Sequence, residues 1–89
     1  MKKDILVLSP NDPWRRLCMQ RYYKMLGGKE SNAVVRVTDG TIETEEAVYH
    51  FRTPVKERLM GCEFSEIRFE EDVLPEDRRM VQAYVRIKK

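Results

Sequence analysis

Three consecutive acids, Glu70, Glu71 and Asp72, follow a strand-like run in the stretch RLMGCEFSEIRFEEDV (58–73). Carboxylates that converge on one point can hold a divalent cation such as Mg²⁺. Successive residues of a strand face opposite sides, however, so these three side chains converge only if the chain turns sharply. We therefore interpret them as a solvated strand end rather than a metal site, and we predict no bound metal and no cofactor.

The other reactive side chains are isolated in the sequence. Cys18 and Cys62 show no CxxC spacing and the chain has only one histidine, so we expect reduced, buried thiols and neither a zinc site nor a disulfide framework. His50 is either an ordinary strand residue with one or two hydrogen bonds or a member of a cluster formed only in space. No GxSxG, HExxH or GxGxxG motif occurs, and we predict that the protein is not an enzyme.

The length and composition predict one folded domain spanning residues 1–89. The chain is 42% hydrophobic and 36% charged, with four glycines and four prolines, which is typical of a folded protein with an ionic surface. The longest apolar run, Ile5–Leu8, is far shorter than the roughly 20 residues of a membrane-spanning helix, and Asp4 interrupts any signal-peptide pattern. We expect a cytoplasmic protein that does not bind a membrane.

Charge is unevenly distributed although the net charge is only +2. Residues 1–29 carry seven basic and two acidic side chains, residues 30–77 carry five and thirteen, and residues 78–89 carry five basic and no acidic ones. Either the basic ends pair with the acidic middle across one surface, or they form a basic patch for an acidic partner.

The first half of the chain predicts a strand, a long helix and a hairpin. Residues 5–8 are continuously apolar, which is typical of a central strand covered on both faces. A helix of about fourteen residues should start at Pro13, capped by Asp12, and end at Gly27-Gly28. Its core-facing side chains are spaced by three or four: Trp14, Leu17, Cys18, Tyr22 and Met25, opposite Arg16, Gln20 and Lys24.

The remaining elements are shorter. A strand at 33–37 should lie parallel to the first strand, and Asp39-Gly40 should turn the chain back in a hairpin. We further predict the following: a strand at 47–51, a short helix that starts at Thr53-Pro54 and ends at Gly61, a strand at 64–70, a turn at 74–77 and a half-buried strand at 81–87. The sum is an α/β fold, with α+β as the alternative, in which one mixed sheet of five or six strands carries one long amphipathic helix packed on one face.

In this order, residues 4–73 resemble part of the ATPase core of phage large terminase subunits and related superfamily 2 helicases. The likeness rests on the segments ILVLSP, DGTIETEEAVYHFRT, the turn RLMG and the strand end at Ile67–Glu71. The GxxxxGK[ST] loop that cradles phosphates in such enzymes does not occur, Arg68 interrupts the strand, and Glu70 stands where an aspartate is usual. The resemblance thus implies a related fold without nucleotide hydrolysis.

Two functions remain open. The first is a small protein-binding adaptor or inhibitor, encoded by a phage or mobile element, that acts on a larger nucleic-acid-processing machine through a sheet edge or through its acidic residues Glu63, Glu66, Glu70, Glu71 and Asp72. The alternative is a nucleic-acid-binding module whose contacts are Arg15, Arg16, Arg21, Lys24, Arg86, Lys88 and Lys89. We favour a protein over nucleic acid as the partner. The protein itself should be a monomer or a homodimer.

Overall fold

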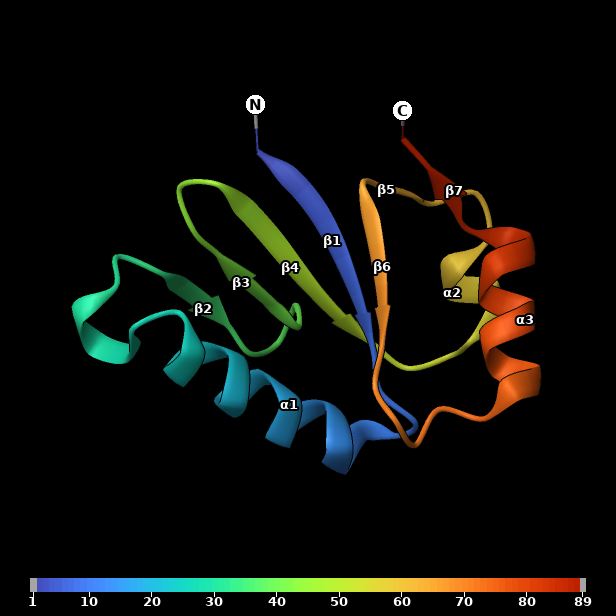
Figure 1. Ribbon diagram of the computed structural model, residues 1–89, viewed down its shortest axis with the longest axis horizontal. Helices are drawn as coiled ribbons and strands as arrows, with labels where there is room; N and C mark the ends of the chain where they lie inside the picture. Colours follow the sequence, from blue (N-terminus) through green and yellow to red (C-terminus); the bar gives the residue numbers. More distant parts are fainter. Residues whose placement is uncertain (1, 89) are drawn as a thin grey trace.

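The structure is a computed structural model that describes residues 2–88. Figure 1 shows a twisted sheet with helices on both of its faces. The elements in chain order are β1 (Lys3–Leu8), α1 (Asp12–Met25), the 3₁₀ helix η1 (Gly28–Glu30), β2 (Val34–Arg36), β3 (Thr41–Glu43), β4 (Ala47–Arg52), α2 (Lys56–Leu59), β5 (Glu63–Phe64), β6 (Glu66–Phe69), α3 (Pro75–Tyr84) and β7 (Arg86–Ile87).

Five strands form one mixed sheet in the order β2-β3-β4-β1-β6. β1 pairs parallel with β4 on one side and with β6 on the other, whereas β3 is antiparallel to both β2 and β4. β5 and β7 form a separate two-stranded parallel sheet. The mixed α/β fold with a five-stranded sheet and one long helix is therefore confirmed. Among residues 2–88, no helix combines the length and the apolar character needed to cross a bilayer.

β1 is the central strand, as its unbroken apolar sequence predicts. Ile5 and Val7 pack in one hydrophobic cluster, and Leu6 and Leu8 pack in another on the opposite face. All four side chains are buried. Alternation along a strand sends successive side chains to opposite faces, so a strand that is apolar at every position needs cover on both.

The two faces are covered by different helices. Cys18 and Met19 of α1 join the cluster of Ile5, whereas Leu59 of α2 and Val81 of α3 join the cluster of Leu6. Figure 1 shows α1 on one side of the sheet and α2 with α3 on the other. The expectation of a helix on one face was therefore incomplete, because it gave the second face of β1 no cover.

The helix α1 has the predicted length of 14 residues, but a different cap and a different buried face. The side chain of Asn11, not Asp12, accepts the hydrogen bond from the Trp14 backbone N–H, at 3.0 Å. Trp14, Leu17 and Met25 are 49%, 52% and 74% exposed, which contradicts their assignment to the core. The face that packs on the sheet is rotated toward its neighbours Met19, Tyr23 and Leu26, together with Cys18 and Tyr22.

The predicted hairpin is present, although its strands lie farther from β1 than the parallel crossover implied. β2 and β3 pair antiparallel around a turn at residues 37–40, in which Gly40 has φ +67°. β2 runs parallel to β1, as predicted, but it sits at the edge of the sheet, with β3 and β4 between the two. The strands that pair directly with β1 are β4 and β6, and the hairpin joins the sheet through the pairing of β3 with β4.

The segment at 75–84 is a helix, so the predicted turn at 74–77 and the predicted strand at 81–87 are wrong. Pro75 occupies the first turn of α3 together with two acids, Glu76 and Asp77, an arrangement that favours a helix start. Val81 and Val85 are buried four residues apart, which satisfies helical spacing as well as strand alternation. Only β7 remains extended.

Two further boundaries differ from the expectation. α2 is a single turn whose N-cap is Val55, and the side chain of Thr53 does not cap it. The strand expected at 64–70 is divided into β5 and β6. Ser65 lies between them, and its backbone N–H donates to the Asp4 carbonyl at 2.7 Å.

Candidate functional site

Glu70, Glu71 and Asp72, the three acids after β6, line one hollow beside Trp14 and Arg21 of α1. Glu70 accepts hydrogen bonds from the Cys18 thiol at 2.7 Å and from the Arg21 guanidinium. Glu71 and Asp72 are exposed. Within residues 2–88, no group of three or more His, Cys, Asp or Glu side chains is arranged to hold a metal ion. Glu70 is thus already bound to two side chains of α1.

The Cys18 thiol is buried beneath α1. Burial, and next to it the carboxylate of Glu70, raises the pKa of Cys18 to about 12. The group therefore stays a neutral thiol at physiological pH and is a poor nucleophile. Neither Cys18 nor Cys62 forms a disulfide, and Cys62 is only half-buried, in contrast to the expectation of two buried thiols.

The other acids proposed for protein binding do not gather into one surface with Glu70. Glu63 is exposed on β5, and Glu66 forms an ion pair with Arg68 on the outer strand β6. Glu66 stands at the beginning of β6, beside Ile5, whereas Glu70 follows its end. Charged side chains on an edge strand discourage pairing with another strand; β6 carries two, Glu66 and Arg68, whereas β2 carries one, Arg36.

The basic residues of α1 point to different sides. Arg15 faces the turn before β3, and Arg16 faces β2. Arg21 is paired with Glu70 on the β6 side, and Lys24 is exposed. Three of these four candidate nucleic-acid contacts, Arg15, Arg16 and Arg21, thus lie beside different elements of the fold.

The basic residues near the end of the chain lie in another part of the molecule. Figure 1 shows β7 beside α3, across the sheet from α1. Arg86 is exposed on β7, and Lys89 lies outside the described residues. Lys88 is bound to Asp4 of β1, with Nζ donating to a carboxylate oxygen at 2.9 Å. The two basic segments therefore do not meet.

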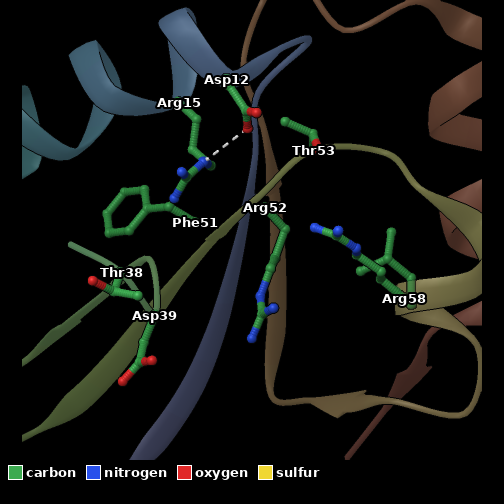
Figure 2. A pocket seen from close by; sticks show the side chains of 9 residues that line it. Asp12, Arg15, Thr38, Asp39, Phe51, Arg52, Thr53 and Arg58 are labelled. Atoms are coloured by element: carbon green, nitrogen blue, oxygen red, sulfur yellow. Dashed lines mark hydrogen bonds and ion pairs between the residues drawn. The ribbon is translucent and has the colours of Figure 1, made fainter. Parts of the chain in front are cut away.

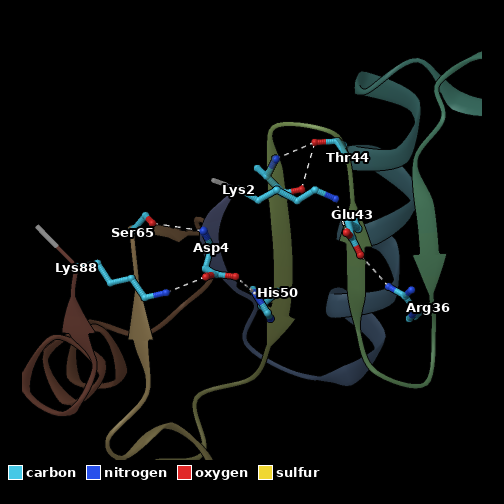
Figure 3. A network of polar contacts seen from close by, with 9 residues as sticks. Lys2, Asp4, Arg36, Glu43, Thr44, His50, Ser65 and Lys88 are labelled. Carbon is cyan, nitrogen blue, oxygen red and sulfur yellow. Dashed lines mark hydrogen bonds and ion pairs between the residues drawn. The ribbon is translucent and has the colours of Figure 1, made fainter.

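Asp4 is the centre of a polar network at the amino end of the sheet (Figure 3). Besides Lys88, it contacts His50, whose Nε2 is 3.1 Å from a carboxylate oxygen. The ammonium group of Lys88 and the ring of His50 lower the pKa of Asp4, and Asp4 in turn raises the pKa of Lys88. His50 is thus a hydrogen-bonded strand residue, and its partner Asp4 belongs to a polar network that forms only in the folded chain.

A second ion-pair group lies beside it. Glu43 of β3 binds both Lys2 and Arg36, as Figure 3 shows, and the pKa of Glu43 is lowered by the two cations. Lys2–Glu43 and Arg21–Glu70 each join the basic first segment to the acidic middle. Part of the uneven charge along the sequence is therefore balanced within the fold.

An apolar groove, here called the α1–β2 groove, runs between α1 and the edge strand β2. It encloses about 390 Å³ and is lined by Arg16, Met19, Gln20, Tyr23, Val35 and Val37. Arg16 is the only charged side chain among the lining residues of the described chain. The groove therefore offers an apolar wall with one positive charge at its border.

β2 leaves one side of its backbone open beside this groove. Within residues 2–88, β2 pairs only with β3. Val34, Val35 and Val37 are 47%, 39% and 62% exposed, although valine is a residue that strands normally bury. The sequence signal for this site was the run AVVRV at 33–37, which marks a strand but does not reveal that the strand stands at an edge.

Comparison with protein-family models, curated proteins and solved structures finds no match to this chain.

Proposed function

We propose that the protein is a non-catalytic adaptor or inhibitor that binds an extended apolar segment of a larger protein along β2 and the α1–β2 groove. The observation that carries the proposal is the open edge of β2 beside an apolar groove. An extended segment can add to such an edge through backbone hydrogen bonds, while every second side chain enters the adjoining pocket. The open edge of β2 and the α1–β2 groove together favour a partner segment that binds as an additional strand.

The charge at the border of the α1–β2 groove indicates which side chains a partner segment should carry. Arg16 is the charged group at the groove, so a partner segment with an acidic side chain next to its apolar ones would be complementary. The opposite edge strand, β6, carries Glu66 and Arg68 and is less suited to strand addition. We therefore assign the binding surface to β2 rather than to the acidic residues around 63–72.

The absence of catalysis is part of the same proposal. The raised pKa of Cys18 makes it a weak nucleophile, and Glu70 is engaged by Arg21 and Cys18. That the partner belongs to a larger nucleic-acid-processing machine rests on the terminase-like sequence segments alone. Nucleic-acid binding is the weaker alternative, because its basic residues lie on different sides of the fold.

A matched pair of substitutions tests the surface. Val35→Asp places a charge in the groove, whereas Val55→Asp makes the same change at a valine of similar exposure, 36% against 39%, at the N-cap of α2. Tagged wild-type and variant proteins are used to capture partners from an extract of the source organism, and a captured protein is then purified and titrated. We expect Val35→Asp to weaken its binding at least about tenfold and Val55→Asp to leave it unchanged.

Hydrogen exchange locates the contact on the purified complex. The proposal expects added protection of backbone amides at 34–37. Protection confined to β5 and β6, or equal binding by both variants, contradicts the assignment to β2. A wild-type homodimer that Val35→Asp dissociates would make a second copy of this chain the occupant and would contradict the choice of a different protein.

A further inference from the structure

A small hollow lies at the carboxyl end of β4, between α1, the turn at 37–40 and α2. It encloses about 160 Å³. Three of its lining side chains are arginines from distant parts of the sequence: Arg15 of α1, Arg52 of β4 and Arg58 of α2. Figure 2 shows these side chains around the end of β4, with Thr53 near the first turn of α1 and Thr38 on the turn.

The topology places this hollow where open α/β sheets bind ligands. β1 and β4 are adjacent parallel strands. The chain leaves β1 toward α1 on one face of the sheet and leaves β4 toward α2 on the other face. Where neighbouring strands send their connections to opposite faces, a crevice opens beyond their carboxyl ends, and ligands bind there in many such folds.

Arg15 is held in place at this crevice. Its side chain is only 18% exposed, and its Nε donates to the Asp12 carboxylate at 3.3 Å. Gly40 leaves the space that the guanidinium occupies, because a Cβ at that position would lie 2.6 Å from the Nη1 atom of Arg15. The glycine in the turn thus allows an arginine from α1 to reach the hollow.

The charges around the hollow are not balanced. In the part of the chain that the structure describes, neither Arg52 nor Arg58 forms an ion pair. Asp12 and Asp39 also line the hollow, so its lining residues include three arginines and two aspartates, and Asp12 is already paired with Arg15. Guanidinium groups bind the oxygens of phosphate in pairs, and such charge-assisted hydrogen bonds are stronger than neutral ones.

We propose that this hollow is a binding site for a phosphoryl group, held by Arg15, Arg52 and Arg58, with the Thr53 hydroxyl as an additional donor. The volume sets the size of the ligand. It is smaller than the roughly 300–1,000 Å³ of pockets that enclose a whole drug-sized molecule. The site therefore takes inorganic phosphate or the terminal phosphate of an ester whose remaining part lies outside.

Calorimetric titration in low-salt buffer tests the site with two probes, inorganic phosphate and a nucleoside 5′-monophosphate. The variants are Arg52→Gln and, because it lies on an exposed helical turn, Arg58→Gln; Arg79→Gln on the exposed surface of α3 is the matched control. We expect each pocket variant to weaken binding of the tighter probe about 10- to 100-fold and the control to bind as the wild type does. Circular dichroism confirms that each variant is folded.

The two probes separate the sources of the phosphoryl group. Equal affinity for both indicates free phosphate, and tighter binding of the monophosphate indicates an ester; both outcomes support the site. If neither probe binds at millimolar concentration, or if Arg52→Gln and Arg58→Gln bind as tightly as Arg79→Gln, the proposal is wrong. An oligonucleotide that carries only internal phosphodiesters is titrated as a third probe. If it binds and the other two do not, the proposal is wrong, because the ligand is then a nucleic-acid backbone.

Discussion

The thiol of Cys18 on α1 donates a hydrogen bond of 2.7 Å to the carboxylate of Glu70, which follows β6. This contact ties the long helix to the outer strand of the sheet. It also occupies Glu70, which accepts a second hydrogen bond from Arg21. The relationship explains why an acidic run that resembles a metal-binding strand end serves packing in this fold.

The raised pKa of Cys18 predicts a loss of stability at alkaline pH. In the unfolded chain the thiol ionises near pH 9, whereas in the folded protein its pKa is about 12, so the folded state holds the proton more tightly. The stabilising contribution is complete below pH 9 and falls by at most about 1.4 kcal/mol per pH unit between pH 9 and 12. Urea unfolding between pH 7 and 11 measures this slope.

Cys18→Ala is the control for the pH dependence of the free energy of unfolding. The variant lacks the titrating thiol, so its free energy of unfolding should decline less steeply over the same pH range. At pH 8, a thiol reagent should label Cys62 in the folded protein and reach Cys18 only after unfolding. Equal labelling rates for the two cysteines would contradict the burial of Cys18.

Asp4→Asn should lower the free energy of unfolding at pH 7 by about 0.5–1.5 kcal/mol, because the carboxylate that binds Lys88 and His50 is lost. The folded pKa of Asp4 lies below its usual value, so this contribution is present above about pH 4 and disappears as the pH falls through the folded pKa. The free energies of unfolding of the wild type and of Asp4→Asn should therefore become equal at acidic pH. Asp72→Asn, at an exposed acid, should change stability by less than about 0.5 kcal/mol.

Gly40→Ala should destabilise the protein more than Gly61→Ala does. Both glycines have positive φ, +67° and +77°, so alanine costs about 1–2 kcal/mol at either position. Only at Gly40 would the new Cβ also lie 2.9 Å from the carbonyl oxygen of Phe51 and 2.6 Å from Arg15. Thermal unfolding of the two variants measures the additional cost of this clash at Gly40. Equal losses of stability would show that the turn at 37–40 rearranges to make room for the new Cβ.

Leu59→Ala tests the second hydrophobic cluster, which α2 and α3 form on the sheet. Leu59 is buried on a helix of a single turn, and its truncation should cost about 2 to 5 kcal/mol. The neighbouring Met60 is exposed, so Met60→Ala should stay within about 0.5 kcal/mol of the wild type. Similar effects of the two substitutions would mean that α2 does not pack on the sheet.

The local sequence determined those helices and strands whose hydrophobic pattern is compatible with only one secondary structure. Residues 5–8 are apolar at every position, so only a strand with two covered faces satisfies them. Pro13 and Gly27 bound a helix of 14 residues, and the Val-rich run before Gly40 leads into a hairpin. In these segments backbone preference and hydrophobic pattern agree on the type of element.

Where one hydrophobic pattern is compatible with two local structures, the tertiary contacts decided which of the two forms. In α1 the faces through Trp14 and through Met19 both follow steps of three and four, and the position of the sheet selects the second. Val81 and Val85 fit a strand or a helix equally, and the uncovered face of β1 favours the helix because it buries both valines against Leu6. The open edge of β2 and the placement of Arg15, Arg52 and Arg58 around one hollow depend on strand order. Strand order is set by contacts between residues far apart in the chain, which no local spacing encodes.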